Sequence, residues 1–126
     1  METKAANKTG AELRDKICAF INEAGIDCRE GAIPEQTFLP GIDIQKGNII
    51  FDPERLAHPG DLLHEAGHMA VLRPKHRPLA GNSENISGDI TPAAAEMAAI
   101  AWSWAACRHL QLAPEVLFHE AGYKGG

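Results

Sequence analysis

Apolar residues recur at helical spacing near the start of the chain, with a period of about 3.6 residues. The stripe comprises Leu13, Ile17, Phe20, Ile21 and Ala24. Thr9–Glu12 has the Ser/Thr-x-x-Glu form of a capping box, and Gly25 has the form of a C-terminal helix cap. We therefore predict a helix over residues 10–24, preceded by a flexible tail at 1–8.

Short β-branched and aromatic runs replace the helical pattern between residues 28 and 53. Turn-forming residues separate them, Pro40-Gly41 first and then Gln45–Asn48. This pattern predicts a hairpin with strands near 41–45 and 48–52.

Two further helices are predicted from their start and stop signals. Pro59 and Asp61 suit the first turn of a helix that Pro74 ends, and a long polar segment follows over 73–91. Thr91-Pro92 then has the form of an N-cap followed by proline at the first helical position.

The second of these helices is rich in alanine and runs to about Leu110. Pro114 begins a short segment that we expect to be helical to Ala121, and residues 122–126 are expected to be flexible. Helices combined with a small hairpin indicate the α+β class, and 126 residues are the usual size of a single domain, here 1–126.

Composition and charge narrow the class of protein. With 44% apolar and 23% charged residues the chain is typical of a globular domain. A net charge of −5 argues against nucleic acid as the main partner. The sequence has no apolar run of the ~20 residues that span a membrane, and its polar N-terminus lacks the apolar core of a signal peptide, so we expect a cytoplasmic protein.

The three cysteines are Cys18, Cys28 and Cys107. Because they are widely spaced and form no Cys-x-x-Cys pair, a cysteine zinc knuckle and a thioredoxin-type redox site are excluded. We expect three free, partly buried thiols.

One short motif points to chemistry: His64-Glu65-Ala66-Gly67-His68 has the His-Glu-x-x-His pattern. Residues four apart lie on one face of a helix, so His64 and His68 can reach the same metal ion. Zinc accepts neutral imidazole nitrogen. Glu65 lies about 100° around the helix, beside the metal rather than on it, where a general base belongs.

A catalytic zinc site needs a third protein ligand. Glu96 is a lone carboxylate in a helix that is apolar nearly all round, which favours an inward ligand. Asp89, in the preceding loop, is the alternative third ligand. His76, His109 and His119 are weaker candidates, and His58, which precedes a proline, is expected to have a local, solvated role.

These residues resemble a family. A hairpin ending in Asn48–Asp52, a His-Glu-x-x-His helix and a further helix bearing Glu96 are similar to the zincin metallopeptidases over residues 41–105. The likeness is greatest to the gluzincin branch, to minigluzincins and to small regulatory peptidases of the ImmA/IrrE type. It implies a minimal zincin-like domain in which His64, His68 and Glu96 bind Zn²⁺ and Glu65 is the catalytic base.

The chain departs from that family at two points. Many gluzincins carry an acidic residue four positions after the ligand glutamate, where this chain has Ile100. The family also uses a downstream tyrosine or histidine to stabilise the oxyanion of the transition state. Only His119 and Tyr123 lie downstream at a plausible distance.

The resemblance implies a peptidase in which zinc activates a water and Glu65 takes its proton and passes it to the leaving amine. A peptide or protein substrate would lie extended along the edge strand of the hairpin. A short chain implies a shallow cleft, hence weak side-chain selectivity and an enzyme that is latent or depends on a partner.

Two other classes of protein remain open. In one, the same ligands stabilise a catalytically silent protein-binding module, although a purely structural zinc needs no base beside it. In the other, the chain is a helical interaction domain and the motif arose by chance.

Overall fold

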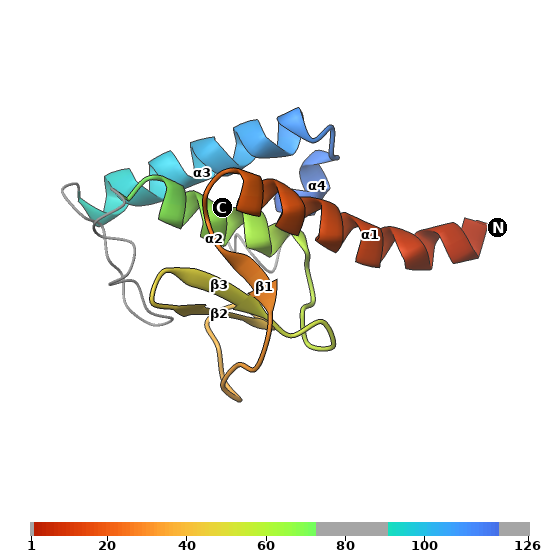
Figure 1. The fold of residues 1–126 in the computed structure, drawn as a ribbon. Coiled ribbons are helices and arrows are strands. Elements are labelled where there is room, and N and C mark those ends of the chain that lie inside the picture. The colour runs from red at the N-terminus through yellow and green to blue at the C-terminus, as the bar shows by residue number, and fades with distance from the viewer. Residues whose placement is uncertain (1, 73–90, 119–126) are drawn as a thin grey trace.

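Four helices and three short strands make up the described chain (Figure 1). A computed structural model describes residues 2–72 and 91–118, and of residues 2–9 the backbone alone. In chain order the elements are α1 (Glu2–Glu23), β1 (Cys28–Glu30), β2 (Ile42–Gln45), β3 (Asn48–Phe51), α2 (Gly60–Ala70), α3 (Pro92–His109) and α4 (Pro114–Leu117). The predicted α+β class is confirmed.

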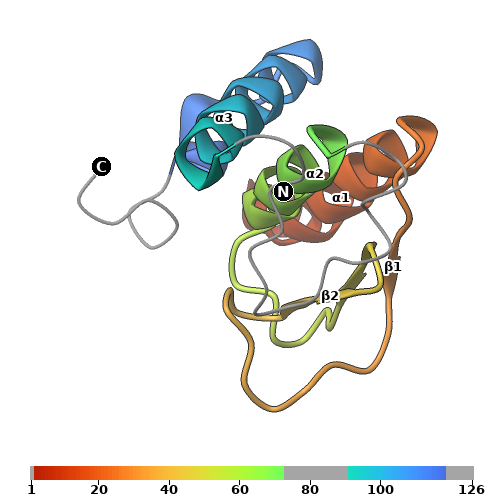
Figure 2. The same cartoon turned by 90° about the vertical axis from the view of Figure 1, so that its left-hand side faces the viewer.

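The elements are arranged in layers. The sheet lies on one side of α1 and α2, and α3 packs on the opposite side of α2 with α4 beside it (Figures 1 and 2). Helix α2 therefore lies between the sheet and α3, buried on both sides, as its apolar residues Leu62, Leu63 and Met69 require.

The predicted hairpin is confirmed, with β2 and β3 antiparallel and Ile44 opposite Ile49. Its turn has positive φ at Lys46 (55°) and Gly47 (83°), the two-residue type I′ geometry that matches the twist of the strands. Strand β1, which the sequence did not predict, pairs in parallel with β3 and gives the order β1-β3-β2.

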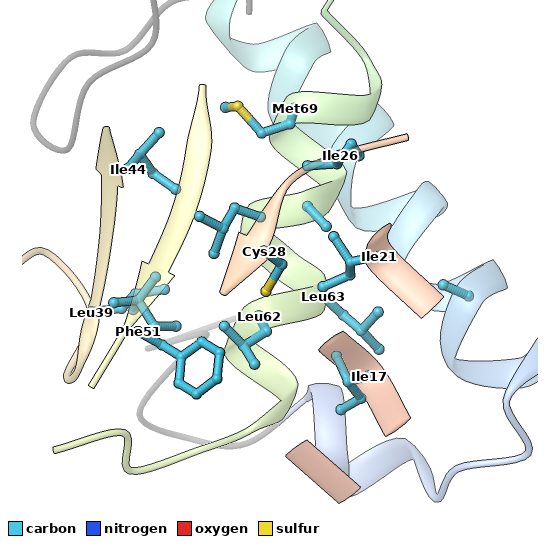
Figure 3. Packing of buried hydrophobic residues seen from close by; sticks show 14 of the residues in the cluster. Ile17, Ile21, Ile26, Cys28, Leu39, Ile44, Phe51, Leu62, Leu63 and Met69 are labelled. Carbon is cyan, nitrogen blue, oxygen red and sulfur yellow. The ribbon is translucent and has the colours of Figure 1, made fainter. Parts of the chain in front are cut away.

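One hydrophobic core joins the sheet to the helices (Figure 3). Ile44 and Phe51 project from the sheet, Ile17 and Ile21 from α1, and Leu62 and Leu63 from α2; these residues are buried. Burial of such side chains contributes roughly 1.5–3 kcal/mol each. The apolar stripe read from the sequence of α1 is the face that enters this core.

The start of α1 differs from the prediction. The helix begins at Glu2, so Thr9–Glu12 lies within it and does not cap it. Alanine, lysine and glutamate before Thr9 are good helix formers, and they extend the helix beyond its apolar stripe. At the other end Gly25, with φ of 93°, closes the helix as predicted.

Helix α2 ends at Ala70, with Val71 as its C-cap, and so stops before Pro74, which was expected to end it. Thr91 caps α3 as expected: its hydroxyl accepts a hydrogen bond from the backbone N–H of Ala94 at 3.2 Å. Helix α4 ends at Leu117, because Phe118 (φ −98°, ψ 70°) leaves helical geometry, and residues 119–121 of its predicted course lie outside the described residues. Among residues 2–72 and 91–118, no helix is both long and apolar enough to cross a membrane.

Candidate metal centre

Helix α2 carries both histidines of the motif on one face. His64 and His68 are one helical turn apart, and their rings stack with centroids 5.0 Å apart and an interplanar angle of 23°. Stacked in this way, the two imidazoles present nitrogen atoms in the same direction.

Helix α3 brings Glu96 to the two histidines. One Glu96 carboxylate oxygen lies 3.3 Å from His64 Nε2, and the other lies 3.0 Å from His68 Nε2. The three residues therefore converge although Glu96 is far from the motif in sequence. Their potential ligand atoms all lie within 4.8 Å of one another.

Small residues allow the two helices to approach so closely. A Cβ atom at Gly67 would lie only 2.5 Å from the backbone oxygen of Ala99 and 3.3 Å from its Cα. Because Gly67 has no side chain, the backbones of α2 and α3 lie in contact one turn from Glu96. That close contact lets a carboxylate on α3 reach imidazoles on α2.

The site opens to solvent on the side of Glu96. The exposed fraction of the side chain rises from 10% for His64 to 28% for His68 and 45% for Glu96. Glu96 is therefore the most exposed of the three residues, and His64 is the most deeply buried.

Burial alters the pKa values of two site residues. The pKa of His68 is lowered first by burial and then by the neighbouring His64, while Glu96 acts in the opposite direction. A lowered pKa keeps the imidazole neutral, the form that binds metal. Burial, together with the negative charges of Asp61 and Glu96, raises the pKa of Glu65 to about 7.

The residues fit a divalent metal ion. Atoms bound at ~2.0–2.1 Å to a tetrahedral zinc lie roughly 3.3 Å apart, close to the 3.0 and 3.3 Å that separate Glu96 from the imidazoles. Two imidazoles and one carboxylate are also a set that zinc accepts, with one position left for another ligand. His64, His68 and Glu96 could thus hold a metal ion.

Several other candidate residues do not join this cluster. His109 lies thirteen residues past Glu96, roughly 20 Å along the helix axis, with its ring 5.6 Å from that of Phe20. His58 lies before α2, and its carbonyl oxygen accepts a hydrogen bond from the Asp61 N–H. The alternative ligand and the proposed oxyanion residues lie outside the described residues, as does one further histidine: Asp89, His119, Tyr123 and His76.

Ile100 occupies the position at which many gluzincins carry an acidic residue. It lines an apolar hollow on the outer side of α3 together with Met97, Ala101, Trp104 and Phe118. The side chain of Ile100 has no polar atom, so it cannot supply the hydrogen bond that an acidic residue gives a metal ligand.

From the sequence, Asp61 was expected only to lie in the first turn of a helix. In the structure its charge also acts on Glu65. Asp61 is 1% exposed, and its charge contributes to the raised pKa of Glu65, one turn further along α2. The four-residue spacing between Asp61 and Glu65 was a usable signal, since such residues share a helix face.

The chain matches no protein family, no curated protein and no solved structure.

Proposed function

We propose that the protein is a zinc-dependent metallopeptidase of minimal zincin-like, gluzincin type. The observation that carries the proposal is the convergence of His64, His68 and Glu96 from two helices, with Glu65 next to His64 in the same motif. Hydrolysis requires a carboxylate outside the ligand cluster that can act as a base. A structural metal site has no such requirement.

In this proposal His64, His68 and Glu96 hold the ion. A bound zinc would act as a Lewis acid toward a carbonyl oxygen and lower the pKa of a coordinated water. The half-buried Glu65 carboxylate accepts a proton from the attacking water and delivers it to the leaving amine. Gly67 and Ala99 keep the two ligand-bearing helices in contact while this occurs.

The substrate in this proposal is an extended peptide or protein segment. In the strand order β1-β3-β2, β2 is an edge strand of the described sheet, so an added strand could pair with its outer edge. Backbone hydrogen bonds would give most of the affinity along such an edge, so selectivity for particular side chains would be weak.

The test compares three preparations of the full chain: wild type, Glu65→Gln and His64→Ala. Glutamine preserves the shape of the side chain but removes its basicity, so Glu65→Gln should retain zinc and the fold while peptide hydrolysis falls by at least about 100-fold. His64→Ala should lose zinc as well as activity. Zinc is measured by elemental analysis after dialysis, and cleavage by mass spectrometry of a mixed peptide library.

Two outcomes would contradict the proposal. Loss of zinc in Glu65→Gln to the same extent as in His64→Ala would make Glu65 a ligand. Equal hydrolysis by Glu65→Gln and wild type would exclude Glu65 as the base.

A second candidate function is a zinc-stabilised, catalytically silent protein-binding module. The observation that favours it is the exposed apolar surface of α3, where Met97 is 71% exposed next to Trp104 and Phe118. This alternative predicts zinc in wild type and in Glu65→Gln, and no hydrolysis by either.

A further inference from the structure

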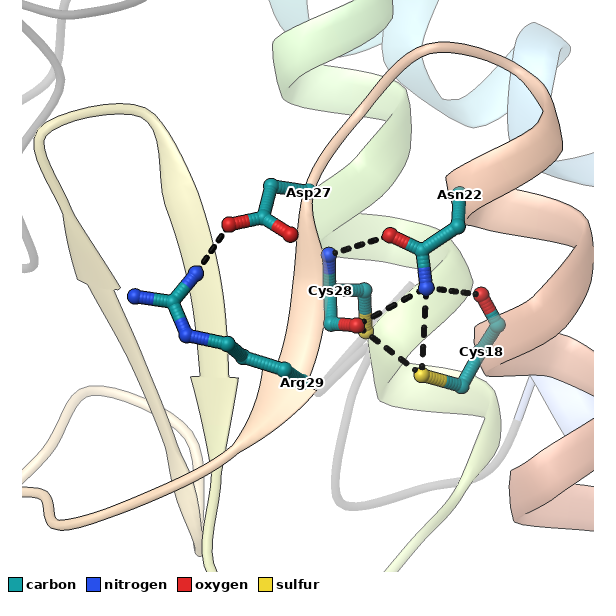
Figure 4. A network of polar contacts seen from close by, with 5 residues as sticks. All are labelled: Cys18, Asn22, Asp27, Cys28 and Arg29. Carbon is teal, nitrogen blue, oxygen red and sulfur yellow. Dashed lines mark hydrogen bonds and ion pairs between the residues drawn. The ribbon is translucent and has the colours of Figure 1, made fainter.

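Two cysteines on consecutive elements lie against each other where α1 meets β1 (Figure 4). Cys18 is in the second half of α1, and Cys28 is the first residue of β1. The Cys18 thiol donates a hydrogen bond to the carbonyl oxygen of Cys28, with the sulfur 3.1 Å from that oxygen. The two side chains are thus neighbours in the fold, as Figure 4 shows.

Asn22 holds this arrangement from the next turn of α1. Its amide nitrogen donates to the Cys28 carbonyl oxygen at 2.9 Å and to the Cys18 carbonyl oxygen at 3.0 Å. Its amide oxygen accepts from the Cys28 backbone N–H at 3.0 Å. Because the same side chain binds both cysteine backbones, the separation of the two cysteines is restrained.

The two thiols differ in access to solvent and in their chemistry. Cys18 is half-buried, whereas Cys28 is only 2% exposed. Burial and the adjacent Cys18 thiol raise the pKa of Cys28 above its ordinary value. A reagent from solvent therefore reaches Cys18 first, and Cys28 stays a protonated neighbour.

The third cysteine provides an internal control. Cys107 is buried on α3, with its sulfur 3.7 Å from the Leu112 carbonyl oxygen and 3.6 Å from that of Ala113. Its neighbours are backbone oxygens, which offer no partner for oxidation.

We propose that Cys18 and Cys28 are a site of oxidative modification that forms a disulfide bond between α1 and β1. The oxidant is a low-molecular-weight disulfide such as oxidised glutathione. The Cys18 thiolate attacks one of its sulfurs, forming a mixed disulfide and releasing one glutathione thiolate. The Cys28 sulfur then attacks the Cys18 sulfur, and the Cys28 proton passes to the second glutathione, which leaves as a thiol. Two protein thiols are oxidised and one disulfide is reduced.

This bond would close the short loop between residues 18 and 28 and fasten the end of α1 to the sheet. Cross-linking a short loop stabilises a fold mainly by restricting the unfolded chain. The oxidised protein should therefore unfold at a temperature higher by about 5 °C or more.

The experiment uses the reduced full chain, which is first treated with oxidised glutathione. It is then denatured in the presence of N-ethylmaleimide, which labels the remaining thiols. We expect intact protein lighter by two hydrogen atoms, with a single label. Trypsin cleaves after Lys16 and Arg29 and gives one peptide containing both cysteines. Chymotrypsin cleaves after Phe20, between them, so the two fragments should remain joined until a reducing agent is added.

Cys107→Ser is the matched control and should form the same linked fragments. Cys18→Ser should form none; it replaces a half-buried residue, and its fold can be checked by its unfolding temperature. The wild-type fragment map does not depend on any variant folding. A Cys18–glutathione adduct that persists, a bond involving Cys107, a disulfide-linked dimer or three labelled thiols would each overturn the proposal.

Discussion

Glu96 is the residue on which the candidate metal centre most depends, because its carboxylate joins α3 to both imidazoles. We expect Glu96→Ala to weaken zinc binding by at least about 100-fold, since loss of a ligand exceeds the 10–100-fold effect of an outer partner. Competition with a fluorescent chelator gives the affinity.

Glu115→Ala, an exposed acidic residue in the first turn of α4, is the matched control and should bind zinc like wild type. Asp89→Asn should also leave the affinity nearly unchanged, because ordering the glycine- and asparagine-containing sequence around Asp89 on binding would cost conformational entropy. Loss of zinc in Asp89→Asn with retention in Glu96→Ala would reverse the assignment of the third ligand.

Cys28 gives a prediction about pH at the same scale. A raised pKa leaves less thiolate than an ordinary cysteine has at pH 8, so alkylation of Cys28 in the reduced, folded protein should be slow. Its rate should continue to rise through pH 9 and above, where an ordinary thiol of pKa about 8.5 levels off. Iodoacetamide labelling at several pH values, followed by peptide mapping, measures this. Levelling near pH 8.5 would contradict it.

At the scale of elements, the contact between α2 and α3 determines whether the ligands meet. Gly67 permits it, because any side chain there would collide with the Ala99 backbone. Ser103, one turn after Ala99, is also buried, and its hydroxyl donates to the Ala99 oxygen at 2.9 Å. The groups that set the spacing of the helices are therefore backbone and small side chains, which have little freedom to move aside.

Gly67→Ala should consequently separate the two helices. We expect a loss of about 1–3 kcal/mol in the free energy of unfolding, together with weaker zinc binding. Urea denaturation and chelator competition are the measurements. Gly10→Ala is the control: it lies within α1 with no atom within 4 Å of an added Cβ, and it should stabilise the helix by about 0.5–1 kcal/mol. Equal effects of the two substitutions would contradict the close packing.

At the scale of the whole molecule, a metal ion would join α2, which packs on the sheet, to α3, which has α2 between itself and the sheet. A ligand that binds only the folded state stabilises it, by about 4 kcal/mol when its concentration is 1,000 times the dissociation constant. Metal bound by His64, His68 and Glu96 should therefore stabilise the entire domain.

Removal of metal with a chelator should lower the unfolding temperature by several degrees, and addition of zinc should restore it. Scanning calorimetry with elemental analysis of the same samples measures this. His64→Ala is the control and should not respond to the chelator. Metal-free wild type with an unchanged unfolding temperature would contradict a stabilising metal centre.

The features that the sequence determined by itself are those governed by residues close together in the chain. The hairpin at residues 42–51, the end of α1 at Gly25 and the cap of α3 at Thr91 all depend on local hydrogen bonds and backbone angles. The helical spacing of His64 and His68 is local as well, and it placed both imidazoles on one face.

The tertiary structure decided the features that join distant parts of the chain. The sequence favoured Glu96 as an inward residue, but only the packing of Gly67 on Ala99 brings its carboxylate to the histidines. Pairing of β1 with β3 has the same origin. Such contacts depend on how buried surfaces fit together in three dimensions, and the spacing of residues along one chain does not contain that information.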